Sequence, residues 1–404
     1  YRNIVQHLHH EFNDIIIWRK IMSNNTNLRE YSSRQHFLDW LSVFAFAYLV
    51  FYHTGMMFVE WPFHIESGHD SKFLRSIMLL TSTWRLDLLF LVSGVAISVM
   101  MAKMSMGQFI WQRVMKLFIP LLFACLVVVV PQPYFEALQK GLIEPGFWQF
   151  WTEQYFHFTW LEGMITPWPT YTHMWYVLYL FFYTLLLIPL ILFINSNNGV
   201  KTLETLENWL IKGIRLLWAP YIIYLGILLY FGHNNVTHNI LDDGFGLLVF
   251  AYILTLGVIF VRMPKVWQAF EKIRYWSLIL ALVAYGIVLI KYNWSTPLDV
   301  INWDLMEMIL KWSWIATLIG FAKRYLNFTN ASLKYCSSIV YPFYILHQTV
   351  TIMIGYYIIA WGMGGIMEYF TIALGTILIS LILIEGLIKQ TNLTRILFGL
   401  KTKK

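Results

Sequence analysis

Apolar residues fill long stretches of this chain, and polar residues gather in the segments between them. Ten stretches approach the roughly 20 mostly apolar residues that a helix needs to cross the hydrocarbon core of a bilayer. Glu307 and Lys311 interrupt the eighth stretch. We predict membrane-spanning helices at 41–59, 84–101, 114–133, 174–194, 214–232, 245–261, 276–291, 305–321, 337–360 and 366–388.

The composition indicates a protein that is largely covered by lipid. Of the 404 residues, 58% are hydrophobic and only 13% are charged. A soluble domain carries roughly 25% charged residues, and a water-exposed surface cannot be built from half of that supply. The sequence therefore predicts an all-α, polytopic integral membrane protein.

The basic residues are distributed unevenly between the two sets of loops that ten helices create. With the N-terminus inside, most of the 29 Lys and Arg residues fall in cytoplasmic segments, and the outer loops hold only Lys72, Arg75, Lys140 and Lys291. Such an asymmetry is typical of membrane proteins, whose cytoplasmic loops are enriched in Lys and Arg. We therefore expect both termini in the cytoplasm, and the net charge of +7 needs no nucleic-acid partner.

The chain is predicted to be one membrane unit with short flanking segments. We expect a polar cytoplasmic lead-in over 1–33, a ten-helix membrane domain over 34–390 and a basic cytoplasmic tail over 391–404. The lead-in contains histidines at 7–10, but no carboxylate or Cys partner stands at a spacing typical of zinc sites. No metal site is predicted.

Titratable residues lie at positions where an unpaired charge is costly in a bilayer. His53 lies about two-thirds along the first helix, Arg85 and Asp87 begin the second, His173 begins the fourth, and His347 lies in the ninth. Residues of this kind usually face a cavity or a partner, so each is a candidate site residue. A single histidine can equally bond a neighbouring carbonyl. Arg85 and Asp87, two apart, point to different helix faces and need not pair with each other.

Five motifs surround these residues. In chain order they are Leu38-Asp39-Trp40-Leu41 leading to Phe51-Tyr52-His53-Thr54-Gly55-Met56, Trp84-Arg85 through Ser93-Gly94, Arg113-Val114-Met115-Lys116 followed by Pro120, His173-Met174-Trp175-Tyr176, and Tyr341-Pro342 through His347-Gln348. The ordered set resembles the acyltransferase-3 family of integral membrane acyltransferases, and within it the glucan biosynthesis protein C branch. The matches extend from residue 34 to about 350. Ser93-Gly94 is also expected to allow close helix packing.

The resemblance implies transfer of an acyl group, acetyl or succinyl, from cytoplasmic acyl-CoA to a hydroxyl of an extracytoplasmic or lipid-linked carbohydrate, in the inner (cytoplasmic) membrane. An attacking hydroxyl needs a base, and imidazole titrates near working pH. We interpret His53 as the general base. Arg85 and His173 are expected to donate to the developing oxyanion or to the carboxylate of a succinyl group, and Asp87 to orient His53 or Arg85.

The donor is expected to be a substrate, with no cofactor bound permanently. Arg113 and Lys116 share one helix face at the cytoplasmic end of the third helix and suit the phosphates of CoA, although anchoring by positive charge explains them equally well. His347 is added to the donor-binding residues. Aromatic residues in the loop 134–173 suit stacking against sugar rings, or an interfacial helix that rests among lipid headgroups.

One position departs from the family pattern. Many members carry an Arg eleven positions before the histidine of the first helix, where this chain has Ser42. Arg34, the nearest upstream arginine, is more than two helical turns away and cannot occupy the same place. A degenerate, inactive homologue therefore stays open as an alternative.

A polytopic transporter or flippase of a sugar-containing substrate is the alternative from another class, because it would also hold titratable groups at mid-membrane. Transporters often contain broken helices at matching places in two halves of the chain, and no such pair stands out in the sequence. A non-catalytic membrane scaffold is the third possibility.

Overall fold

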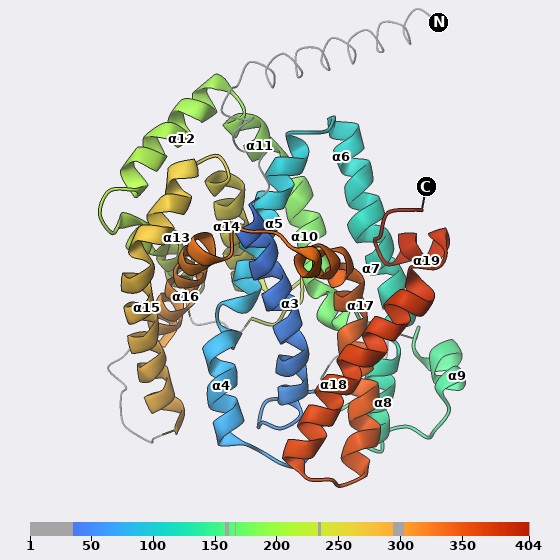
Figure 1. Cartoon of the computed structure of the whole chain (residues 1–404). Helices are drawn as coiled ribbons and strands as arrows, with labels where there is room; N and C mark the ends of the chain where they lie inside the picture. The colour runs from blue at the N-terminus through green and yellow to red at the C-terminus, as the bar shows by residue number, and fades with distance from the viewer. Residues whose placement is uncertain (1–34, 158–160, 166, 233–235, 294–302, 404) are drawn as a thin grey trace, which may run out of the picture.

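A computed structural model describes residues 35–157, 161–165, 167–232, 236–293 and 303–403 (Figure 1). The predicted lead-in over 1–33, with its histidines, lies outside the described residues. Within the described ranges the chain forms helices and no β-strand, which confirms the all-α class.

The helices are joined by connections that range from single residues to long loops. In chain order they are α3 (His36–Met56), α4 (Lys72–Ser82), α5 (Arg85–Met101), α6 (Met106–Arg113), α7 (Ile119–Phe123), α8 (Pro131–Gln139), α9 (Phe147–Gln149), α10 (Trp175–Leu186), α11 (Ile188–Ile194), α12 (Asn197–Leu210), α13 (Arg215–Phe231), α14 (Gly244–Phe260), α15 (Pro264–Asn293), α16 (Trp303–Tyr325), α17 (Ala331–Ala360), α18 (Gly365–Leu383) and α19 (Asn392–Leu397). Each of the ten predicted spans overlaps one or more of these helices. Two π-helical turns, Val114–Phe118 and Ala124–Val128, join α6, α7 and α8 into one continuous helical run.

Helix length and hydropathy support a multi-pass membrane protein. Among the described residues, seven helical runs are long and apolar enough to cross a bilayer, or nine if two bent pairs each form one span. α14 is apolar but has only 17 residues. The count of ten spans and the cytoplasmic placement of both termini therefore stay predictions.

Two of the spans are broken by sharp bends. α10 and α11 meet at 50°, where Pro189 in the first turn of α11 has no backbone N–H to donate. α12 and α13 meet at 116°, and Gly213 adopts a positive φ of 59° in the connection. The two bends follow each other in the chain rather than standing at matching places in two halves.

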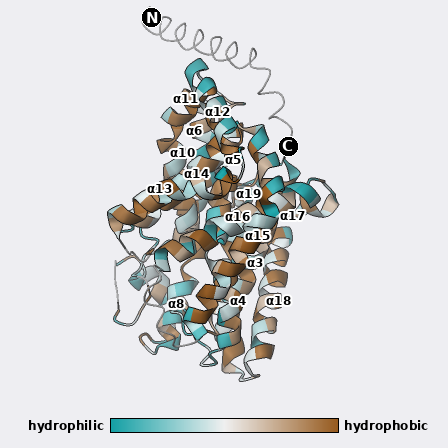
Figure 2. Cartoon of the chain, turned by 90° about the vertical axis from the view of Figure 1, so that its left-hand side faces the viewer, coloured by the Kyte–Doolittle hydropathy of each residue, from teal (hydrophilic) through white to brown (hydrophobic). Residues whose placement is uncertain are grey.

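The surface of the bundle is apolar over much of its area. Leu229 on α13, Val283 on α15 and Ile382 on α18 are all exposed. Figure 2 shows hydrophobic residues on the helices along the height of the bundle, whereas hydrophilic residues are prominent in α12. In a membrane such a surface contacts lipid, which explains why so few charged residues are needed.

α5 and α14 approach each other so closely that each needs a glycine at the contact. A Cβ on Gly94 would lie 2.0 Å from the carbonyl oxygen of Leu254, and one on Gly257 would lie 1.9 Å from that of Leu91. The predicted close packing at Gly94 is therefore confirmed. Because α5 carries Arg85 and Asp87, this contact also fixes the position of two candidate site residues.

Gly94→Ala is expected to destabilise the protein. The added methyl group has to push α5 away from α14, and overpacking of this kind costs about 1–3 kcal/mol or more. Gly286→Ala in α15 is the control, since nothing lies within 4 Å of a Cβ at that position. Melting temperatures in detergent should fall for Gly94→Ala and hold or rise for Gly286→Ala. Equal melting temperatures for the two variants would contradict the close contact.

Candidate active site

Four of the predicted site residues line one large cavity. The cavity has a volume of about 730 Å³, and its lining includes His53, Arg85, Asp87 and His173. Its walls come from α3, α5, α10, α14, α16 and α17, from the end of α4, and from the loops that precede α4, α10 and α14. A concave site of this size with several convergent polar groups is typical of a small-molecule site.

His53 lies half-buried in the last turn of α3. Its ring stacks on Phe63, with the centroids 5.9 Å apart, and lies 5.2 Å from the ring of His347. The Nδ1 atom of His53 is buried and has no hydrogen-bond partner among the residues that the structure describes. A buried polar atom without a partner is costly, so this nitrogen is available to a ligand.

His347 lies behind His53, on α17, and is almost fully buried. Its Nδ1 lies 2.6 Å from the carbonyl oxygen of Tyr344, and because a carbonyl only accepts, Nδ1 carries the hydrogen. Nε2 is then an acceptor, and no residue that the structure describes forms a hydrogen bond with it. The structure thus brings His347 close to the predicted base, and its part in donor binding stays a prediction.

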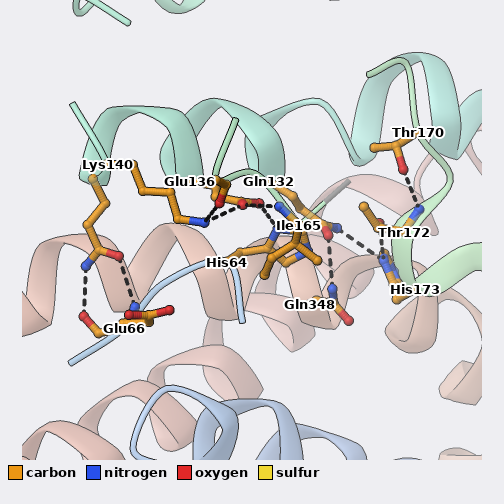
Figure 3. Close-up of polar contacts among 12 residues, drawn as sticks. His64, Glu66, Gln132, Glu136, Lys140, Ile165, Thr170, Thr172, His173 and Gln348 are labelled. Atoms are coloured by element: carbon orange, nitrogen blue, oxygen red, sulfur yellow. Dashed lines mark hydrogen bonds and ion pairs between the residues drawn. The ribbon is translucent and has the colours of Figure 1, made fainter. Parts of the chain in front are cut away.

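Both ring nitrogens of His173 are engaged by the protein. Nε2 lies 3.2 Å from the carbonyl oxygen of Ile345 and therefore donates to it, while Nδ1 accepts from the side-chain amide of Gln132 at 3.1 Å (Figure 3). Gln132 also donates to Thr349 and accepts from Gln348. His173 thus ties α10 to α8 and α17, and donation to an oxyanion would require the bond to Ile345 to be given up.

Arg85 is the most available cation of the cavity. It is the first residue of α5 and is only 3% exposed, with its guanidinium carbon 3.7 Å from the ring centroid of Tyr52. In the described part of the chain, this cation–π contact leaves Nε and Nη1 buried without hydrogen-bond partners. A buried guanidinium with free N–H groups suits a carboxylate or phosphate, which it can bind with two parallel hydrogen bonds.

Asp87 forms an ion pair with Lys311, a pairing that was not predicted from the sequence. Its Oδ2 lies 3.2 Å from Nζ of Lys311 on α16, and Lys311 also donates to the hydroxyl of Tyr224 at 3.3 Å. Asp87 therefore balances the charge of Lys311, and its role in orienting His53 or Arg85 stays a prediction. This ion pair agrees with the expectation that Arg85 and Asp87 need not pair with each other.

Arg113 and Lys116 lie apart from the cavity. Arg113 is 6% exposed, and its Nη2 bonds Oε1 of Gln112 and contacts Sδ of Met100. Lys116 donates to the carbonyl oxygen of Gly399 at 2.6 Å, which anchors the C-terminal tail. Neither residue, nor Ser42 on α3, is among the residues that line the 730 Å³ cavity.

The cavity also contains titratable residues that sequence reasoning missed. Lys311 and Glu307 had been noted only as interruptions of a span, although a charge inside a span is itself a signal of a site. His238 stacks on Trp175 with ring centroids 4.0 Å apart. Desolvation lowers the pKa of His238 to about 4, and the charge of Arg85 acts in the same direction. This imidazole is therefore neutral at physiological pH.

Comparison with known proteins decides the class of enzyme. The family described as an acyltransferase domain matches residues 35–385, which include all seven predicted site residues. This chain belongs to the acyltransferase-3 family. It is thus a membrane acyltransferase rather than the transporter that the sequence left as an alternative.

The curated relatives of this acyltransferase are distant. The chain is similar to the glucans biosynthesis protein C of three Escherichia coli strains, UTI89, O81 (ED1a) and SMS-3-5. Each is 22% identical over 340 residues, which cover 81% of this chain and 84% of the relative. No solved structure matches the chain.

Proposed function

We propose that this acyltransferase moves an acetyl or succinyl group from acyl-CoA to a hydroxyl of a carbohydrate, with His53 as the general base. One observation carries the proposal: a buried nitrogen of His53 and two buried nitrogens of Arg85 have no hydrogen-bond partner among the described residues, and both side chains line the same cavity. Acyl transfer to a hydroxyl requires a base that takes the hydroxyl proton and a hydrogen-bond donor that stabilises the oxyanion. The name of the curated relatives supports a glucan as the acceptor.

The transfer proceeds without a further co-reactant. His53 takes the proton of the attacking hydroxyl as its oxygen forms a bond to the thioester carbonyl carbon. Negative charge then develops on the carbonyl oxygen, where N–H groups of Arg85 stabilise it. The C–S bond then breaks, and the acyl group remains on the acceptor as an ester. The departing CoA thiolate takes the proton from His53. The products are an acylated carbohydrate and free CoA.

We place the enzyme in the cytoplasmic membrane with both termini inside, because the basic residues gather in the loops on that side. The loops before α4, α10 and α14 then face outward and surround the acceptor end of the cavity. α6, which carries Arg113, lies toward the opposite end of the bundle from α4 and α8 (Figure 1). CoA arriving from the cytoplasm would meet Arg113 and Lys116 there.

Arg85→Met is expected to impair the use of succinyl-CoA more than that of acetyl-CoA. Only the succinyl group has a free carboxylate, and a hydrogen bond to a charged group contributes about 1.5–3 kcal/mol. The ratio of kcat/KM for succinyl-CoA to that for acetyl-CoA should therefore fall about 10- to 100-fold. Acetyl-CoA serves as the internal control, since loss of oxyanion stabilisation affects both donors. An unchanged ratio would show that Arg85 does not bind the acyl carboxylate.

A further inference from the structure

His64 faces the same cavity and is held by a buried carboxylate. It lies in the loop between α3 and α4, lines the cavity, and is 4% exposed. Its Nδ1 lies 2.5 Å from Oε2 of Glu136 on α8 (Figure 3). Glu136 is fully buried, and its other oxygen accepts from the ammonium of Lys140 at 2.8 Å and from the backbone N–H of Ile165 at 2.7 Å.

The bonds around Glu136 determine which nitrogen of His64 a ligand can use. The carboxylate already holds one ammonium and one backbone N–H, so it accepts a hydrogen from Nδ1 of His64 without an unbalanced charge. With Nδ1 engaged by Glu136, Nε2 is the ring nitrogen of His64 that is left for a ligand. A carboxylate that fixes the tautomer and orientation of a histidine in this way is common where the other nitrogen contacts a ligand or substrate.

His64 differs in this respect from the other histidines at the centre of the site. Both nitrogens of His173 are engaged by protein groups. Among the described residues, no group forms a hydrogen bond with Nδ1 of His53. Phe63, next to His64 in the chain, packs against both rings, with centroids 5.9 Å from His53 and 5.5 Å from His64. His53 and His64 therefore share Phe63 as an aromatic neighbour, and both line the same cavity.

The same contacts place His64 at the loop-covered end of the cavity. The loop that carries His64 and the loop that carries Ile165 are both tied to α8 through Glu136. Two residues after His64, the backbone N–H of Glu66 donates to Oε1 of Gln139 on α8 at 2.9 Å. The side-chain amide of Gln139 in turn donates to the backbone carbonyl of Glu66 (Figure 3). Polar side chains and several hydrogen bonds to α8 therefore hold the loops at this end of the cavity.

We propose that His64, positioned by Glu136, binds the carbohydrate acceptor. Its Nε2 accepts a hydrogen bond from a sugar hydroxyl that neighbours the attacking one, and this bond directs the attacking oxygen toward His53. The assignment rests on the proposed function, because it names the acceptor-binding residue of the same cavity. His64 then contacts the substrate, and Glu136 is a positioning residue.

Two substitutions of His64 separate substrate binding from loop attachment. In His64→Asn, the side-chain amide can still donate to Glu136 from near the place of Nδ1, but the atom at the place of Nε2 is lost. In His64→Gln, the longer amide reaches the place of Nε2. We expect His64→Asn to lower kcat/KM for soluble glucan oligosaccharides about tenfold, mainly through KM. His64→Gln should retain more of the wild-type value, and KM for the acyl-CoA should not change in either variant.

His69→Asn is the matched control, because His69 lies exposed in the same loop. Wild-type acceptor kinetics in His64→Asn would overturn the proposal and leave His64 as a loop attachment only. Calorimetric binding of the same oligosaccharides, without a donor, gives a readout that does not depend on turnover. Weaker binding by His64→Asn than by the wild type supports the role of His64 even if no acyl transfer is observed. A lack of acyl transfer would refute the proposed function, not the role of His64. Equal binding by the two proteins, or no binding by the wild type, overturns the role of His64.

Discussion

His53→Ala is expected to lower the rate of acyl transfer by about 10²- to 10⁴-fold, the range typical for loss of a general base. The hydroxyl of a sugar is a weak nucleophile until its proton is taken, and the variant leaves no imidazole at the end of α3 to take it. The measurement is the initial rate at which purified protein forms the acylated carbohydrate at saturating donor and acceptor.

The same variant should keep its fold and its donor affinity. Nδ1 of His53 makes no hydrogen bond within the described ranges, so removal of the ring breaks none there at that atom. The melting temperature should therefore still rise when acyl-CoA is added, because a ligand that binds only the folded state stabilises it. His69→Ala, in the exposed part of the loop after α3, should transfer at the wild-type rate. A His53→Ala rate close to that of the wild type would remove His53 from the mechanism.

Lys311→Met is expected to destabilise the protein by about 3–5 kcal/mol, because it leaves a buried charge without its partner. Asp87 is 1% exposed, and Lys311 provides its ion pair at 3.2 Å. The melting temperature in detergent should fall accordingly. The double variant Asp87→Asn with Lys311→Met should recover much of the loss, since it removes both charges together.

An ion pair at the surface provides the matched control for this variant. Lys389 and Glu385 lie 2.5 Å apart near the end of the membrane domain, and the side chain of Glu385 is 47% exposed. Exposed pairs contribute about 0–1 kcal/mol, so Lys389→Met should change the melting temperature little. Similar changes for Lys311→Met and Lys389→Met would show that the pair between Asp87 and Lys311 does not stabilise the bundle.

The positions of the helices could be predicted because bilayer thickness sets their length. Each run of apolar residues had to form its backbone hydrogen bonds internally, and all ten predicted segments overlap helices. The bends were not predicted. Pro189 marks one of them, but a proline tolerated within an apolar stretch does not reveal by how much the helix turns.

The candidate residues could be predicted more readily than their partners. His53, Arg85, Asp87 and His173 stood out because charge or imidazole in an apolar helix is costly, and the fold brings all four to one cavity. Hydrophobic periodicity does not determine which helices become neighbours, so the pairing of Asp87 with Lys311 was missed.

The loops were the hardest part to interpret from the sequence. His64 and Glu136 lie outside or at the edges of the apolar stretches, where polar residues are expected and give no signal. Only the packing of the loop after α3 against α8 makes Glu136 a buried carboxylate. Gly94 was predictable for the opposite reason, because a small residue within a long apolar helix is typical of close helix packing.

The central claim, acyl transfer from CoA to carbohydrate, is tested most directly by following an isotope-labelled acyl group. Purified protein in detergent is incubated with labelled succinyl-CoA or acetyl-CoA and soluble glucan oligosaccharides, and the products are analysed by mass spectrometry. We predict a labelled ester on the oligosaccharide, together with an equal amount of free CoA, and its loss in His53→Ala. Intact thioester and unmodified oligosaccharide with both donors, from folded wild-type protein, would contradict the account.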